Sequence, residues 1–180
     1  MDMYSDEYDR LMLQLAKKER SSFETLYQKL KNQVYGLALA ILKNRDDASD
    51  VMQNVFIQVW EAAPQYRPGT DARAWVMKIT RNLALYHLRK NKHNIVFEEY
   101  QVTNPSEHKV SEALDKLVLR ELLNMLDKDE RQIVMLYSLC GYTQKEISNI
   151  MGKPYATIRW KFSNAMKKLS NIVEEETYHE

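Results

Sequence analysis

Apolar residues recur along the chain every three or four positions, the spacing that places side chains on one face of an α-helix. This pattern predicts helices over residues 5–18, 21–43 and 46–64. The predicted N-caps are Ser21 or Ser22 for the second helix and Asp46 or Asp47 for the third. The predicted buried stripes comprise Tyr8, Leu11, Met12 and Leu15; then Phe23, Leu26, Tyr27, Leu30, Val34, Leu37, Ala38 and Ile41; and then Ala48, Val51, Met52, Val55, Phe56 and Val59.

A fourth predicted helix follows the turn at Pro68-Gly69 and takes Thr70 or Asp71 as its N-cap. Its segment Trp75–Lys92 contains five basic residues and no carboxylate. The stripe predicted to be buried is Ala72, Trp75, Val76, Ile79, Leu83 and Tyr86. The neighbouring stripe is cationic and contains Lys78, Arg81, Arg89 and Lys92, with Asn82 at its border.

A cationic ridge beside aromatic and amide side chains suits a nucleic acid whose bases are partly unstacked. The cations meet phosphates, and the rings offer flat surfaces to bases. The alternative interpretation is a core helix with a solvated basic back. The helix alone does not decide between the two.

The third predicted helix carries an unusual outer face. This face mixes acidic and amide groups with a large aliphatic side chain and an indole: Asp50, Gln53, Asn54, Ile57 and Trp60. Interfaces mix apolar anchors with polar groups in this way, so we interpret the face as a protein-docking surface. Scattered apolar surface residues are the plainer interpretation.

Residues 94–112 lose the helical period, and we interpret them as an extended linker in which Ile95–Phe97 forms a short strand or a docking segment. A helix is predicted to follow from Ser111. Its apolar stripe is Ala113, Leu114, Leu117, Val118, Leu122, Leu123 and Leu126. Asp127 and Glu130 then resemble a capping box that opens a helix through Leu139.

The last part of the chain predicts a helix-turn-helix. Thr143 and Glu146 can cap a short helix over 143–151, and Ser148 and Gly152 suit a close helix crossing and a left-handed turn. In the final helix the side chains predicted to face inward are Tyr155, Ile158, Phe162, Ala165, Met166 and Leu169. The outer face holds Lys153 in the turn, then Ala156, Arg159, Trp160, Ser163, Asn164 and Lys167. Short polar groups and cations at this place fit the major groove of DNA, and a solvated basic face is the alternative.

The composition narrows the class of protein. Four glycines and four prolines in 180 residues favour long helices, and the net charge of +1 leaves only the local charge pattern informative. The one cysteine, Cys140, is expected to be a buried thiol. We see no secretion signal and no apolar run long enough for membrane insertion, so a cytoplasmic protein is expected.

Catalysis is not indicated by any motif. The four glycines stand apart, and His87, His93, His108 and His179 lack the spacing of metal ligands. We therefore expect no catalytic residue, no metal and no cofactor. The prediction is an all-α chain of two helical domains, residues 1–93 and 113–180, joined by the flexible linker 94–112.

Two separated motifs carry a resemblance to a known family. The run Asp47–Phe56 with Trp60, the turn Tyr66–Gly69 and the segment Arg73–Arg89 resemble region 2 of bacterial sigma factors. Residues 126–169, with Gly141-Tyr142-Thr143 and Glu146-Ile147 before the turn, resemble sigma region 4. With a short linker between them, the two are similar to the extracytoplasmic-function (ECF) class of the sigma-70 family.

This resemblance implies a promoter-specificity subunit of RNA polymerase. By the same resemblance, Asp50, Gln53, Asn54, Ile57 and Trp60 dock on core polymerase, and the loop Tyr66–Asp71 takes a flipped base. Residues implied in binding and opening the minus-ten element are Tyr66, Arg67, Thr70, Asp71, Trp75, Lys78, Arg81, Asn82, Tyr86 and Arg89. Residues implied in reading the minus-thirty-five duplex are Lys153, Tyr155, Ala156, Thr157, Arg159, Trp160, Ser163, Asn164 and Lys167. An anti-sigma protein is expected by analogy.

A stand-alone helix-turn-helix regulator, with a first domain that senses a ligand or dimerises, is the alternative function. It predicts duplex binding without polymerase and two-fold symmetric operators. The basic helix and the exposed face around Ile57 and Trp60 count against it.

Overall fold

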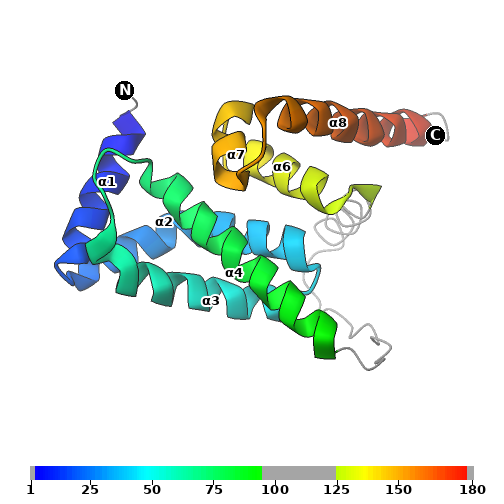
Figure 1. The fold of residues 1–180 in the computed structure, drawn as a ribbon. Coiled ribbons are helices and arrows are strands. Elements are labelled where there is room, and N and C mark those ends of the chain that lie inside the picture. Colours follow the sequence, from blue (N-terminus) through cyan, green and yellow to red (C-terminus); the bar gives the residue numbers. More distant parts are fainter. Residues whose placement is uncertain (1–2, 95–124, 178–180) are drawn as a thin grey trace.

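The structure is a computed structural model that describes residues 3–94 and 125–177, and every regular element in these two ranges is helical (Figure 1). The first range contains α1 (Met3–Ala16), α2 (Arg20–Leu42), α3 (Arg45–Ala62), the short 3₁₀ helix η1 (Ala63–Gln65) and α4 (Ala72–Asn94). The second contains α6 (Lys128–Ser138), α7 (Gln144–Met151) and α8 (Tyr155–Thr177). The predicted strand Ile95–Phe97, the rest of the predicted linker after residue 94 and the predicted helix up to residue 124 lie outside the described residues. The all-α prediction is confirmed.

The first half is a bundle in which α2, α3 and α4 pack against one another and α1 lies across their ends (Figure 1). Its largest fully buried side chains are Met12, Leu15, Leu26, Leu30, Leu37 and Met77. Most of these are the positions that the helical period predicts. The apolar face of each helix therefore points into a shared core.

Two helix starts differ from the prediction. Helix α2 begins at Arg20, with Glu19 in the N-cap position, and the Ser22 hydroxyl is buried and donates to the carbonyl of Glu19 at 2.6 Å. Helix α3 is capped by Asn44, whose side chain accepts from the backbone N–H groups of Asp46 (2.9 Å) and Asp47 (3.1 Å). Helix α2 thus has no side-chain cap hydrogen bond, whereas Asn44 at α3 takes the role predicted for Asp46 or Asp47.

Helix α4 is rotated relative to the predicted buried stripe. Val76, Met77, Thr80 and Ala84 are buried, whereas Trp75, Ile79 and Leu83 are half-buried, and Tyr86 is 60% exposed. Placing Tyr86 on the buried stripe was therefore wrong. The reason is that α4 has neighbours on two sides, α2 and α3 on one and α7 on the other, so its buried arc is shifted.

The second half follows the predicted motif closely. Asp127 with Glu130 and Thr143 with Glu146 both form capping boxes, and Gly152 ends α7 in the left-handed conformation (φ 63°, ψ 35°). The Ser148 hydroxyl donates to the carbonyl of Lys153 at 2.7 Å and so ties the end of α7 to the turn. The predicted helix-turn-helix is present.

The two halves pack against each other through α2 on α6 and α4 on α7 (Figure 1). One hydrophobic cluster runs through both halves, from Leu37 in α2 to Ile133 and Leu136 in α6. Gly36 lets α6 approach closely, because a Cβ at this position would lie 2.5 Å from the Cδ2 atom of Leu139. The sequence predicted the two domains but not this closed arrangement.

Polar contacts reinforce the contact between the halves. The Arg131 guanidinium, nearly buried, donates from Nε to the carbonyl of Ala40 (2.9 Å) and from Nη1 to that of Leu126 (2.6 Å). Ala40 lies in the last turn of α2, where carbonyl groups lack partners within the helix. A cation is favourable at this end of the helix dipole.

No helix in 3–94 or 125–177 is long and apolar enough to cross a bilayer. Within the same ranges, no group of three or more His, Cys, Asp or Glu side chains is placed to hold a metal ion.

Candidate nucleic-acid interface

The loop 66–71 between η1 and α4 has a defined shape in the structure. The Asp71 carboxylate accepts from the backbone N–H of Ala74 at 3.0 Å and so caps α4, as one of the two predicted alternatives. The Thr70 hydroxyl donates to the carbonyl of Arg67 at 2.7 Å, and Gly69 takes a φ of +80° that only glycine adopts without strain. Arg67, Thr70 and Asp71 are exposed.

Tyr66 supports this loop from within. Its side chain is only 7% exposed, its ring packs edge-on against Trp75 with centroids 5.7 Å apart, and its hydroxyl meets the Asp9 carboxylate and the carbonyl of Thr70. Burial, followed by the hydrogen bond to Asp9, raises the pKa of the Tyr66 phenol, so the hydroxyl keeps its proton and acts as a donor. The resemblance implied that Tyr66 contacts DNA directly, but in this arrangement its side chain is buried and DNA cannot reach it.

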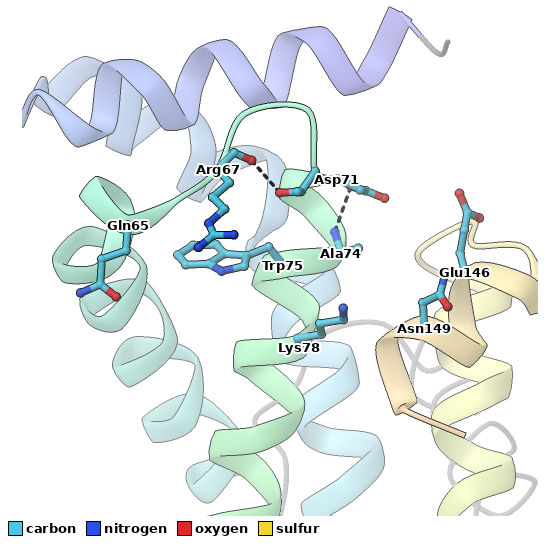
Figure 2. Close-up of a pocket in the computed structure, with 9 residues that line it drawn as sticks. Gln65, Arg67, Asp71, Ala74, Trp75, Lys78, Glu146 and Asn149 are labelled. Carbon is cyan, nitrogen blue, oxygen red and sulfur yellow. Dashed lines mark hydrogen bonds between the residues drawn. The ribbon is translucent and has the colours of Figure 1, made fainter. Parts of the chain in front are cut away.

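A cavity of about 600 Å³ lies between the loop, α4 and α7. Figure 2 shows Arg67, Asp71, Trp75 and Lys78 on one side of it and Glu146 and Asn149 of α7 on the other. The second half of the chain thus forms a wall of the space beside the predicted base-binding loop.

On the basic ridge of α4, Lys78, Arg89 and the bordering Asn82 are exposed, and so is the neighbouring Tyr86. Lys92 lies on a part of α4 whose side chains are outside the described residues. Arg81 is half-buried and donates from Nε to the Gln132 side chain of α6 at 2.9 Å. Burial lowers the pKa of Arg81, and nearby Asp129 opposes this effect. One predicted DNA contact is therefore engaged by the other half of the chain.

Arg73 of α4, which the sequence placed only within a motif, links the two halves of the chain. Its guanidinium lies between the rings of Tyr8 and Tyr142, 5.6 Å and 5.1 Å from their centroids, and donates to the carbonyl of Cys140 at 2.6 Å. Cys140 is buried, as predicted, and this burial raises the pKa of its thiol to about 12. No sequence signal reveals this contact, because the partners lie 67 positions apart.

The exposed face of α8 carries most residues of the predicted groove reader. Ala156, Arg159, Trp160, Ser163 and Lys167 are exposed, whereas Thr157 and Asn164 are half-buried. Tyr155 and Met166 are also exposed, so their placement on the inward face was wrong; Tyr155 is the first residue of α8 and is 50% exposed. Trp160 is 62% exposed and stands beside Lys161, so it does not pack against the first half.

Lys153 in the turn is half-buried and pairs with Asp129 at 2.6 Å. Nearby, Lys161 pairs with Asp127 at 2.7 Å. Burial alone would raise the pKa of Asp127, but the hydrogen bond from Lys161 and two backbone N–H groups lower it. These pairs join the start of α6 to the helix-turn-helix.

The residues of the predicted docking face on α3 differ in their exposure. Asp50, Gln53 and Asn54 are exposed, and Ile57 is 55% exposed beside them. Trp60 is half-buried instead: its ring packs edge-on against Phe23 of α2 at 5.5 Å, and the Lys18 ammonium lies 4.8 Å from its centroid. His87 of α4 is partly buried, with its Nε2 atom 2.9 Å from the Asp47 carboxylate.

Comparison with known proteins assigns both halves. The family model for Sigma-70 region 2 matches residues 26–94, and that for Sigma-70 region 4 matches residues 116–169, so the two ranges cover more than half of the chain. The chain is 23% identical over 177 residues to the ECF RNA polymerase sigma factor SigK of Mycolicibacterium vanbaalenii, covering 94% of this chain and 90% of SigK. It is 27% identical over 149 residues to the probable RNA polymerase sigma factor RfaY of Xanthomonas campestris; this match covers 78% of the chain but only 37% of RfaY.

Two solved structures share the fold. CnrH in complex with the cytosolic domain of CnrY superposes with a TM-score of 0.71 at 20% identity, covering 93% of this chain and 97% of CnrH. RpoE in complex with the anti-sigma factor NepR from Bartonella quintana also gives 0.71, at 23% identity, covering 84% of this chain and 96% of RpoE. With both regions matched in order and one fold shared, the chain belongs to the sigma-70 family of RNA polymerase sigma factors, in its extracytoplasmic-function class.

Proposed function

We propose that this chain binds core RNA polymerase in the cytoplasm, directs it to particular promoters and helps to open the minus-ten element, acting by binding and not by catalysis. The observation that carries the proposal is the pairing of two different DNA-binding surfaces in one chain. One is a basic helix beside a shaped loop and a half-buried indole, and the other is a helix-turn-helix with a polar, cationic outer face. A groove reader alone has no means of holding separated strands.

The first surface is assigned to the minus-ten element. Opening a duplex costs a few kcal/mol for each flipped or unstacked base, so stacking and phosphate contacts must offset that cost. Exposed cations at Lys78 and Arg89 offer phosphate contacts along α4, and the ring of Trp75 lies with Lys78 in the wall of the cavity. We assign the outer face of α8 to the minus-thirty-five duplex and the face around Ile57 on α3 to core polymerase.

The closed arrangement has to open for both DNA contacts to form together. The two promoter elements lie about 25 base pairs apart, which is roughly 80 Å along B-form DNA, whereas α4 and α7 touch in this structure. The two halves therefore have to separate, and they remain joined through residues 95–124.

The decisive experiment combines core-polymerase binding with run-off transcription on a promoter library. The wild-type protein is expected to co-migrate with core polymerase in size-exclusion chromatography and to support transcription from a subset of promoters. Tight duplex binding with no polymerase present and no transcription would instead support the stand-alone regulator.

Replacing Lys78 by alanine should weaken open-complex formation and flatten its salt dependence. Each lost phosphate contact lowers the slope of log K against log salt by roughly one unit. Arg81→Ala should lower it similarly, provided that opening releases Arg81 from Gln132. Lys17→Ala, which removes an exposed lysine just after α1, is the control and should leave the slope unchanged. An unaltered slope for Lys78→Ala would contradict phosphate contact.

Arg159→Ala should change base preference within the upstream duplex and not weaken all promoters alike. A side chain that reads a base edge contributes about 1–3 kcal/mol of discrimination. The measurement is holoenzyme binding to duplexes that differ by single base pairs in the minus-thirty-five element, with the exposed Arg10→Ala of α1 as the control. An equal loss on every duplex would show that Arg159 touches only the backbone.

We also propose that an anti-sigma protein regulates this chain. RpoE of Bartonella quintana, which shares its fold, was solved with the anti-sigma factor NepR. Exposed Ile57 on α3 offers an apolar anchor for such a partner as well as for polymerase. Competition between a candidate anti-sigma protein and core polymerase for this chain is the corresponding test.

A further inference from the structure

The loop 66–71 has few internal hydrogen bonds to maintain its shape. Among its backbone groups, the N–H of Tyr66 donates to the carbonyl of Ala63 (3.0 Å) and that of Thr70 to the carbonyl of Arg67 (3.3 Å). No regular helix runs through it, and Gly69 sits in the left-handed region. A loop of this kind needs an external partner to remain in one conformation.

That partner is Asp9 on α1, some sixty positions earlier in the chain. Its Oδ2 atom accepts from the backbone N–H of Gly69 at 2.8 Å, and its Oδ1 atom accepts from the hydroxyl of Tyr66. One carboxylate therefore ties the tip of the loop and its buried anchor to the same helix. Tyr66 in turn packs against Trp75, the indole beside the cavity.

We propose that Asp9 is the positioning residue of the minus-ten loop: it holds residues 66–71 in their base-receptive shape before DNA arrives. Asp9 does not contact DNA in this scheme and acts through Tyr66 and Gly69. The inference rests on the proposed function, because it concerns the same loop. Holding a loop in its bound conformation improves affinity by removing the entropic cost of ordering it.

The chemistry of the contact distinguishes two substitutions at this position. The Tyr66 hydroxyl has one proton and faces two acceptors, Asp9 and the carbonyl of Thr70, so it donates to one at a time. Asparagine can accept from Gly69 through its oxygen and donate through its amide to the phenol oxygen, which leaves the phenol proton for Thr70. Asp9→Asn should thus preserve the loop, whereas Asp9→Ala removes both ties.

The first measurement uses the free, full-length protein. Amide hydrogen exchange at Gly69, followed by NMR, should be faster in Asp9→Ala than in the wild type. It should be near wild type in Asp9→Asn and in Glu7→Ala, which removes a neighbouring carboxylate of α1 that pairs with Lys29 instead. Equal protection of Gly69 in Asp9→Ala and wild type would overturn the proposal.

The second measurement uses the holoenzyme with a single-stranded oligonucleotide. The probe carries the non-template minus-ten segment of a promoter that the wild-type protein selects in run-off transcription, with or without an abasic site at each position. Asp9→Ala should bind the intact probe roughly tenfold more weakly and lose most of the preference for a base over an abasic site. Asp9→Asn should remain within about twofold of wild type, and affinity for core polymerase should be unchanged in all variants.

These readouts separate positioning from stability. Tyr66→Phe keeps the buried ring but removes the hydroxyl, and it should weaken probe binding partway without unfolding the bundle. A uniform loss of core binding, probe binding and melting temperature in Asp9→Ala, with Tyr66→Phe unaffected, would show a merely structural role and overturn the inference. If the wild-type protein binds no polymerase, the proposed function itself fails; if it does and Asp9→Ala keeps its base preference, only this inference fails.

Discussion

An Ile57→Asp variant is expected to bind core RNA polymerase roughly thirtyfold more weakly than the wild type, which corresponds to about 2 kcal/mol. Ile57 is exposed on the face of α3 that it shares with Asp50, Gln53 and Asn54, so the substitution removes an apolar anchor without opening the core. A carboxylate buried in the interface without a partner adds a desolvation cost. Size-exclusion co-migration and a fluorescence titration with core polymerase measure the loss.

Leu13→Asp is the matched control for this substitution. Leu13 is 44% exposed on α1, so the two changes have the same chemistry and similar exposure on different faces of the bundle. The control should bind polymerase like the wild type, and both variants should melt at similar temperatures. Equal loss of binding in the two variants would show that general surface charge, and not the face of α3, is responsible.

Gly36→Phe is expected to separate the two halves of the free protein. A Cβ at residue 36 already lies 2.5 Å from Leu139 Cδ2 and 3.4 Å from Met135 Sδ, and an aromatic ring cannot fit between α2 and α6. Overpacking of this kind costs about 1–3 kcal/mol. The cost should weaken the contact between the two halves and not helix α2 itself, because phenylalanine has a higher helix propensity than glycine. The radius of gyration from small-angle X-ray scattering should then rise clearly above about 16 Å, the value for a compact chain of this length.

Gly36→Ala provides the contrast. Leu139 is itself exposed, so its terminal methyl group can turn away from one added carbon while the halves stay together. Alanine should also stabilise α2 by up to about 1 kcal/mol relative to glycine. If Gly36→Phe keeps the radius of gyration of Gly36→Ala, the closed arrangement does not depend on this close approach.

The consequence for function follows from mass action. A closed form that engages Arg81 and covers one side of the minus-ten cavity lowers the fraction of protein ready to bind DNA. Gly36→Phe should therefore support open-complex formation at lower protein concentration than Gly36→Ala. Arg73, Arg81 and Arg131 form hydrogen bonds between the two halves. Water can replace these hydrogen bonds when the halves separate, so they suit an interface that opens.

Local chemistry explains why parts of the site were predictable. The two capping boxes, the left-handed Gly152 and the Asp71 cap each depend on residues within five positions of one another, and all were anticipated from the sequence. The exposure of Ile57 followed from helical spacing on α3. Trp60, one turn further on, is half-buried because Phe23 and Lys18 contact it from other segments. The spacing of apolar residues within one helix does not predict contacts of this kind.

The sequence by itself determined the helical class, the two motif-bearing regions and their order, since these depend on apolar period, caps and turn residues that act over a few positions. Only the tertiary structure decided which arc of α4 is buried, that Tyr66 supports its loop from within, and that Asp9 holds the loop tip. It alone also decided how the two halves meet. Each of these rests on contacts between residues some forty to ninety positions apart, whose geometry is fixed by the packing of whole helices and by no local pattern.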